Sequence, residues 1–203
     1  PILLKSEDMK PEAEGETLQP VVGAAEIPML SMGHLVNKGR ALAWRGPMAG
    51  NALSQLIDAH WDDVDTLLVD LPPGTGDVQL TMLQRYKPMG AVLVSTPQDL
   101  ALIDAARAGQ LFDQAGGPVI GLVENMAGYA CPHCGEVSDP FGRGGVETAA
   151  GRLALPFLGR IPLDLAIREG SDRGQPPACG EDALAAPFHD IAAKVDAWIG
   201  AQN

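Results

Sequence analysis

The sequence predicts an α/β protein built on a doubly wound, mostly parallel sheet with helices on both faces. Three near-continuous apolar runs, at 66–70, 91–95 and 118–123, alternate with segments of helical pattern. Strands that are apolar throughout are typical of parallel sheets, because both faces of such a sheet are covered. Ligands of these sheets bind at the carboxyl ends of the strands, so we expect the functional residues to follow these three runs.

The other elements follow from local patterns along the chain. We expect short strands at 27–32 and 41–44, and then a helix over 47–60 whose apolar residues recur at helical spacing. Further helices are expected over 77–85, 99–115, 144–153 and 182–199, and a further strand over 157–161. Residues 1–26 are predicted to form an irregular lead-in. Residues 27–203 are predicted to form a single α/β domain with a cysteine-containing loop near 125–145.

The last predicted helix has one apolar face. A helix lying on a membrane surface needs Lys and Arg opposite its apolar face, and only Lys194 is available here. We therefore expect the face to dock on the protein core. Its residues are Phe188, Ile191, Val195 and Trp198.

Charge and composition exclude several classes of protein. The 203 residues include 14 Lys and Arg against 26 Asp and Glu, a net charge of −12, and aromatic residues make up only 4%. Binding to nucleic acid depends on basic side chains and stacking aromatics, so we expect no nucleic-acid partner. No apolar run approaches the roughly 18 residues of a membrane span. Three cysteines, an odd number, argue against a secreted disulfide framework, so we expect a cytoplasmic protein with no membrane partner.

Asp70 is the first candidate for chemistry. It ends an apolar run and precedes a turn that contains Pro72, Pro73 and Gly74. In nucleotide hydrolases an acid at this place holds a magnesium-bound water, and such a turn can switch when a terminal phosphate leaves. The alternative is a carboxylate that caps a helix or forms hydrogen bonds within a loop. The sequence leaves both interpretations open.

The sequence carries no match to G-x-x-x-x-G-K-[ST], the loop that cradles nucleotide phosphates. None of its five lysines is preceded by Gly and followed by Ser or Thr. Residues 1–203 therefore contain a candidate acid for the magnesium-bound water but no loop of this type to bind the phosphates.

A second candidate is the pair Cys131 and Cys134, which enclose Pro132 and His133. A dithiol redox motif needs its first cysteine at a helix start, and no helical pattern follows here. A structural zinc site takes four ligands. Two thiolates from each of two chains would supply four ligands for one iron–sulfur cluster. These three interpretations, and an inert pair, remain open from the residues alone.

Two weaker candidates complete the set. Asn125 follows the third apolar run and has the donor and acceptor needed to pair with an adenine edge, although an Asn that satisfies a turn is the default interpretation. Cys179 lies in a Pro- and Gly-rich loop and is interpreted as a plain structural or surface thiol.

Taken together, these residues make the chain resemble the Mrp/ApbC family of iron–sulfur cluster carrier ATPases, relatives of MinD and of the nitrogenase iron protein. The resemblance extends over essentially the whole chain. Its matching stretches are 44–48, 69–77, 95–98, 124–126, 131–135 and 158–164.

The resemblance implies a P-loop NTPase-like fold and a homodimer that binds ATP with Mg and hydrolyses it slowly. It implies a [4Fe–4S] cluster held between subunits by Cys131 and Cys134 and passed to apo iron–sulfur proteins. It makes Asp70 the magnesium-side acid and Pro72, Pro73 and Gly74 the switch. It places Asn125 against adenine, with Pro162 and Asp164 lining the base pocket.

The resemblance also implies that the family's phosphate-binding loop, with its two lysines, lies upstream of Pro1. Three alternatives to a cluster carrier remain. They are a thiol–disulfide oxidoreductase, a zinc-binding protein that uses the same cysteine loop, and a MinD-like positioning ATPase.

Overall fold

The computed structural model describes residues 1–36 and 46–202, which form two compact units. Unit 1 consists of residues 1–82 and 169–176, and unit 2 of residues 83–168 and 177–203. The strand expected at 41–44 lies outside the described residues. The division into a lead-in and one domain stays a prediction.

Unit 2 is built on a three-stranded parallel sheet. Strands β5 (Ala91–Ser95), β6 (Val119–Glu124) and β9 (Phe157–Arg160) pair in the order β5-β6-β9, so β6 is central. The expected strands at 91–95, 118–123 and 157–161 are confirmed to within a residue or two. Since the strands run parallel, their carboxyl ends share one edge of the sheet.

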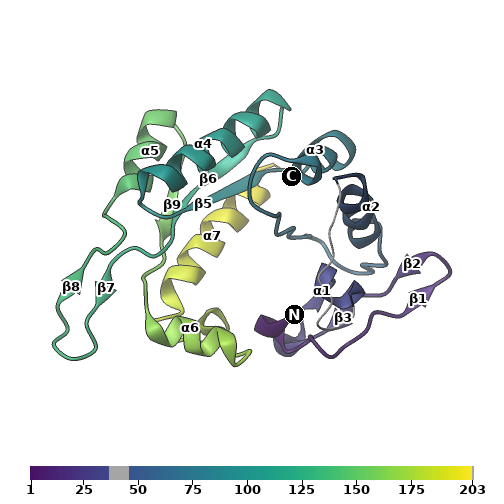
Figure 1. The fold of residues 1–203 in the computed structure, drawn as a ribbon, viewed down its shortest axis with the longest axis horizontal. Coiled ribbons are helices and arrows are strands. Elements are labelled where there is room, and N and C mark those ends of the chain that lie inside the picture. The colour runs from purple at the N-terminus through teal and green to yellow at the C-terminus, as the bar shows by residue number, and fades with distance from the viewer. Residues whose placement is uncertain (37–45, 203) are drawn as a thin grey trace. The chain divides into compact units, whose positions relative to one another are not determined.

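Helices cover both faces of this sheet, as Figure 1 shows. Helices α4 (Asp99–Gln114) and α5 (Gly145–Leu153) lie on one face, and α7 (Ala186–Gly200) lies on the other. The first face buries Leu93, Leu122, Val146 and Ala150. The second buries Ile120, Val123, Leu158 and Ile161 against the apolar face of α7, which comprises Phe188, Ile191, Val195 and Trp198. The doubly wound prediction and the docking of the last helix are both confirmed.

A glycine lets β9 approach the central strand closely. A Cβ added at Gly121 would lie 2.6 Å from the carbonyl oxygen of Pro156 and 2.8 Å from Leu158. The same carbonyl accepts a hydrogen bond from the Leu122 N–H at 2.9 Å. A side chain at position 121 would therefore push apart two strands whose pairing starts here.

The prediction of a strand at 66–70 is wrong. These residues have no strand conformation and pair with none of the strands in the described parts of the chain. Leu68 is 84% exposed, and Asp70 is exposed as well. An apolar run becomes a strand only where a neighbouring ladder satisfies its backbone N–H and C=O groups. The described residues of unit 1 provide no such ladder for this run.

Unit 1 has short elements around one longer helix. The expected helix over 47–60 is confirmed by α2, and the expected helix over 77–85 appears as α3 followed by a π-helical turn, η3. The strand expected at 27–32 is reduced to β4, and short strands occur in the expected lead-in. The elements are η1 (Ile2–Leu4), β1 (Ala13–Glu14), β2 (Thr17–Leu18), β3 (Val21–Val22), η2 (Ala24–Glu26), β4 (Pro28–Met29), α1 (Met32–Leu35), α2 (Gly46–Ile57), α3 (Asp77–Thr81) and, across the boundary between the units, η3 (Met82–Tyr86).

The remaining elements lie in the second half of the chain. They are β7 (Tyr129–Ala130), β8 (Val137–Ser138), α6 (Leu165–Asp172) and η4 (Pro177–Cys179). Of these, α6 begins in unit 2 and ends in unit 1. None of the helices in residues 1–36 and 46–202 has both the length and the apolarity that crossing a bilayer requires.

A buried serine–histidine pair holds the beginning of unit 1 together. Ser6 is fully buried, and its Oγ lies 3.0 Å from Nε2 of buried His34. Nδ1 of His34 accepts a hydrogen bond from the Ser31 N–H at 3.2 Å, so in the neutral ring Nε2 carries the proton and donates to Ser6. The imidazole therefore cannot act as a base for this hydroxyl, and the pair is structural. Burial of the ring lowers the pKa of His34.

The contrast between buried Leu122 and exposed Leu68 can be tested. Leu122→Ala should lower the free energy of unfolding by about 2–5 kcal/mol, because it leaves a cavity between the sheet and its helices. Leu68→Ala should change it by no more than about 0.5 kcal/mol. Urea titrations followed by circular dichroism measure both values. A loss of more than about 1 kcal/mol for Leu68→Ala would show that the run at 66–70 is buried in the protein.

The lowered pKa of His34 predicts an acid-sensitive unit 1. The unfolded chain, with an ordinary pKa of about 6.5, binds the proton more readily than the folded chain, so stability falls as the pH drops below that value. Urea midpoints measured at pH 7 and pH 5 should differ more for the wild type than for His34→Gln. His60→Gln, which changes an exposed histidine of the same unit, is the control. Equal pH dependence in all three proteins contradicts the prediction.

Candidate functional site

The two paired cysteines lie at the tip of a β-hairpin. Strands β7 and β8 pair antiparallel, and the connection between them contains both thiols. The Cys131 N–H donates to the Glu136 carbonyl at 2.9 Å, and the Gly135 N–H donates to the Cys131 carbonyl at 2.8 Å. Gly135 has a φ of +73°, a backbone conformation that favours glycine. The sequence predicted an irregular loop here, because strands of two residues have no detectable periodicity.

Hydrogen bonds within this tip favour the thiolate form of Cys131. Both cysteines are free, with Cys131 half-buried and Cys134 exposed. The backbone N–H of His133, then that of Cys134, and then the Cys134 thiol hydrogen bond to the Cys131 sulfur, and these bonds lower the pKa of Cys131. Metals bind the thiolate form of cysteine, so N–H groups that stabilise this form prepare the sulfur as a ligand.

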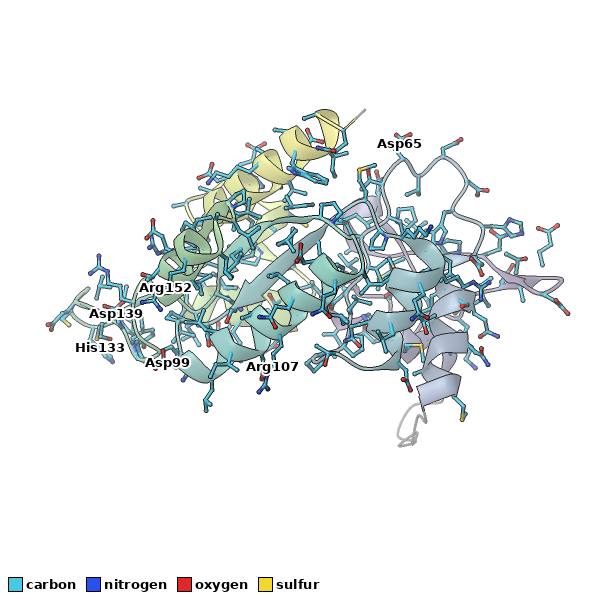
Figure 2. The ribbon with its side chains drawn as sticks, turned by 90° about the horizontal axis from the view of Figure 1, so that it is seen from above. Asp65, Asp99, Arg107, His133, Asp139 and Arg152 are labelled. Carbon is cyan, nitrogen blue, oxygen red and sulfur yellow. The ribbon has the colours of Figure 1, made fainter. Side chains whose placement is uncertain are left out.

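The tip projects away from the sheet. Figure 2 shows His133 and Asp139 at the far left end, beyond the helices that carry Arg152 and Asp99. Residues 132–134 form a turn rather than a helix, so Cys131 does not stand at the helix start that a dithiol redox motif uses. In the part of the chain that the structure describes, no three His, Cys, Asp or Glu side chains group closely enough to hold a metal ion.

The first leg of the hairpin is tied to the segment that follows β9. The Ala127 N–H donates to the Ile161 carbonyl at 3.0 Å, and the Leu163 N–H donates to the Gly128 carbonyl at 2.9 Å. Tyr129 and Leu163 form a parallel bridge. The segment containing the predicted base-pocket residues, Pro162 and Asp164, is therefore attached to the root of the cysteine hairpin.

Asn125 lies where the sequence predicted, at the carboxyl ends of β5 and β6. Its backbone N–H donates to the Ser95 carbonyl at 2.8 Å, and its Oδ1 accepts from the Met126 N–H at 2.9 Å. Asp164 accepts a hydrogen bond on Oδ1 from the Ala166 N–H at 2.7 Å, near the start of α6. Both oxygens therefore have a local structural partner, and the predicted contacts with a nucleotide base stay predictions.

The predicted switch residues lie in unit 1, whereas the cysteines, Asn125, Pro162 and Asp164 lie in unit 2. Pro72, Pro73 and Gly74 are exposed, and Gly74 has a φ of +97°. Buried Gln79 donates from Nε2 to the Pro72 carbonyl and anchors the turn to α3. Asp70 itself is exposed and precedes this turn outside any strand.

Glu124 is a residue whose importance sequence reasoning missed. It ends β6 and is 0% exposed, yet it carries a charge. Its Oε1 accepts from Arg160 Nε at 2.9 Å, and its Oε2 accepts from the Val146 N–H at 3.0 Å. Leaving a buried charge unpaired costs about 3–5 kcal/mol, so both bonds matter. The signal in the sequence is a carboxylate that directly continues an apolar strand, because such a group needs a buried partner.

Arg160 joins this carboxylate to a second one. Its Nη2 forms an ion pair with exposed Glu147 of α5, and its guanidinium stacks 5.0 Å from the centre of the Phe157 ring. Burial lowers the pKa of Arg160, but the hydrogen bonds to Glu124 and Glu147 outweigh burial and raise it. A cavity of ≈ 690 Å³ adjoins the pair, and its lining includes Gly128, Val137, Asp139, Gly142 and Arg143.

Comparisons with known proteins find relatives over most of the chain. The chain is 46% identical over 170 residues to an iron–sulfur protein required for NADH dehydrogenase, mitochondrial, from Arabidopsis thaliana, covering 83% of this chain and 54% of that protein. It is 40% identical over 202 residues to an iron–sulfur cluster carrier protein from Salmonella typhimurium, covering 98% of this chain and 55% of that protein. The chain thus spans about half the length of these relatives.

A solved structure is also similar. A nucleotide-binding protein from Archaeoglobus fulgidus in complex with ADP superposes with a TM-score of 0.73 at 36% identity, covering 90% of this chain and 71% of that one. The model of the family described as "ParA: NUBPL iron-transfer P-loop NTPase" matches residues 1–196. With nearly the whole chain matched, the protein belongs to the NUBPL iron-transfer family of P-loop NTPases.

Proposed function

We propose that the protein is an ATP-dependent iron–sulfur cluster carrier, in which Cys131 and Cys134 of two chains hold one [4Fe–4S] cluster for transfer to apoproteins. One observation carries the proposal. In a chain of the iron-transfer family, two free cysteines stand at the tip of a projecting hairpin, and backbone N–H groups lower the pKa of one of them. The cluster is cargo, so the site must both hold it and release it.

The hairpin geometry suits a cluster shared between two copies. A [4Fe–4S] cluster takes four thiolates, and one tip supplies two. Two identical tips that meet on a twofold axis supply the full set without any further ligand. Cys134 is exposed, so an incoming thiolate of a recipient protein reaches its iron more readily than the iron on half-buried Cys131. Release then proceeds by replacement of one thiolate by another, with no net change in oxidation state.

For nucleotide hydrolysis, the proposal assigns roles to residues 70–74 of unit 1. We assign the magnesium-bound water to Asp70 and the phosphate-sensitive switch to Pro72, Pro73 and Gly74. The switch is supported by the anchored turn, whose Gly74 φ of +97° few other residues adopt. Residues 1–203 contain no phosphate-cradling lysine loop, so ATP binding and hydrolysis are proposed for the longer protein that the relatives represent.

The adenine contact is assigned to Asn125, with Pro162 and Asp164 beside it. Asn125 lies at the carboxyl edge of the parallel sheet, where ligands of such folds bind. The similar Archaeoglobus protein is in complex with ADP, which supports a nucleotide as the ligand. A cytoplasmic location also stays a prediction.

The cysteine assignment predicts the iron content of the protein. After anaerobic reconstitution, the wild type should bind iron and show the visible absorbance of a cluster. Cys131→Ala and Cys134→Ala should each lose most of both, because a site with two thiolates from each chain loses half of its ligands. Cys179→Ala removes the third, exposed thiol and is the matched control. Unchanged iron content in Cys131→Ala contradicts the proposal, and zinc in place of iron would favour a zinc site instead.

Sharing one cluster between two chains predicts a change in oligomeric state. Sedimentation or native mass spectrometry should find two chains for each cluster in the reconstituted protein, and the cluster should be absent from any monomer fraction. The double variant Cys131→Ala/Cys134→Ala, treated identically, should gain no dimer upon reconstitution. A cluster bound to a single chain would refute the shared site while leaving the cysteines as ligands.

A further inference from the structure

We propose that Glu124 is the positioning residue of the cysteine hairpin, and that its carboxylate joins the two ends of the segment 125–145. We name the pairing of Glu124 with Val146 and Arg160 the Glu124 clamp. The importance of the clamp for a cluster rests on the function proposed above. Its effect on the hairpin does not, because it can be measured in the metal-free protein.

The clamp closes a long loop at its base. Glu124 is the last residue of β6, where the chain leaves the sheet toward the cysteines. Val146 lies in the first turn of α5, where the chain returns. The 3.0 Å bond from the Val146 N–H to Oε2 therefore joins points 22 residues apart. Ordering the segment between them costs conformational entropy, and a fixed base limits the positions that its tip can adopt.

Packing alone does not hold the hairpin in place. The cavity of ≈ 690 Å³ is lined from the hairpin side by Gly128, Val137 and Asp139, and from the base by Glu124 and Arg160. Val137 in β8 is 65% exposed. With open space along the hairpin, its direction depends on the hydrogen bonds and ion pairs at its root rather than on a packed core.

The two legs are fixed in different ways. The first leg has backbone bonds to the segment after β9, through Ala127 and Gly128. The return segment, 139–145, reaches the sheet through α5, whose N-terminal Val146 N–H depends on Glu124. Arg160 then joins Glu124 to Glu147 of the same helix. Loss of the carboxylate should therefore loosen the return segment and let the tip move.

Hydrogen–deuterium exchange of the full, metal-free chain tests the clamp. In Glu124→Ala, amides of 127–144 should exchange at least about tenfold faster than in the wild type, while amides of β5 keep their protection. Glu124→Gln keeps an acceptor for the Val146 N–H but loses the charge, so its exchange should be intermediate. Glu136→Gln removes the same charge from an exposed residue of the hairpin tip and should change nothing.

Two outcomes of this experiment would overturn the proposal. One is unchanged exchange of 127–144 in Glu124→Ala. The other is equal acceleration in the hairpin and in β5, which would show that Glu124 stabilises the whole unit instead of the hairpin. If Glu124→Ala does not fold, the near-isosteric Glu124→Gln provides the same comparison.

Reconstituted protein tests the consequence for the cysteines. Glu124→Ala should lose its cluster to an iron chelator several-fold faster than Glu136→Gln, because its two thiols no longer hold a fixed position. Loss at the wild-type rate, together with faster exchange of the hairpin, overturns a positioning role toward the cluster. If the wild type itself binds no iron, the proposed function fails, while the exchange experiment still decides on the clamp.

Discussion

The burial of β6 on both faces is the constraint on which unit 2 depends. A strand with helices on either side must be apolar along its length. Polar side chains are confined to its end. In β6 that end is Glu124, which stays buried and takes its hydrogen bonds from Arg160 and the Val146 N–H. The next residue, Asn125, already lies at the open edge of the sheet. The residue proposed to contact adenine therefore directly follows the residue that clamps the hairpin, at the carboxyl end of β6.

The position of the cysteines follows from this arrangement. The chain leaves the sheet after β6, forms a hairpin, and returns to begin α5 against the same strand. A projecting tip suits the proposed sharing and release of a cluster, because a buried site would have to open first. The same exposure leaves the thiols open to other chemistry. A lowered pKa of Cys131 favours metal ligation and thiol exchange alike, so it is the turn at residues 132–134, in place of a helix, that argues against a dithiol enzyme.

Unit 1 shows how little an apolar run determines without a partner. Residues 67–69 are all apolar, as are residues 91–94 of β5. Yet β5 is ordered by its ladder with β6, whereas the run at 66–70 pairs with no strand in the described parts of the chain. Individual hydrogen bonds fix parts of this region. Gln79 holds the turn after Asp70, and the buried pair of Ser6 with His34 joins the start of the chain to α1.

The sequence by itself determined two kinds of element: helices with a local apolar periodicity, and strands that are buried on both faces. The helices over 99–114 and 145–153, the strands β5, β6 and β9, and the docking face of α7 all follow from apolar spacing. The cysteine pair, Asn125 and the turn at Pro72 were likewise recognisable as candidates, since residue type and place after an apolar run are visible in a linear chain.

Only the tertiary structure decided what holds those candidates in place. No spacing rule connects Glu124 with Val146 or with Arg160, because these bonds join residues 22 and 36 positions apart. The hairpin that carries the cysteines has strands too short to leave a pattern, and its root is fixed by backbone bonds to residues 161 and 163. The reason is physical. Periodicity reports which side of an element is buried, whereas the pairing of polar groups depends on which distant elements the fold brings together.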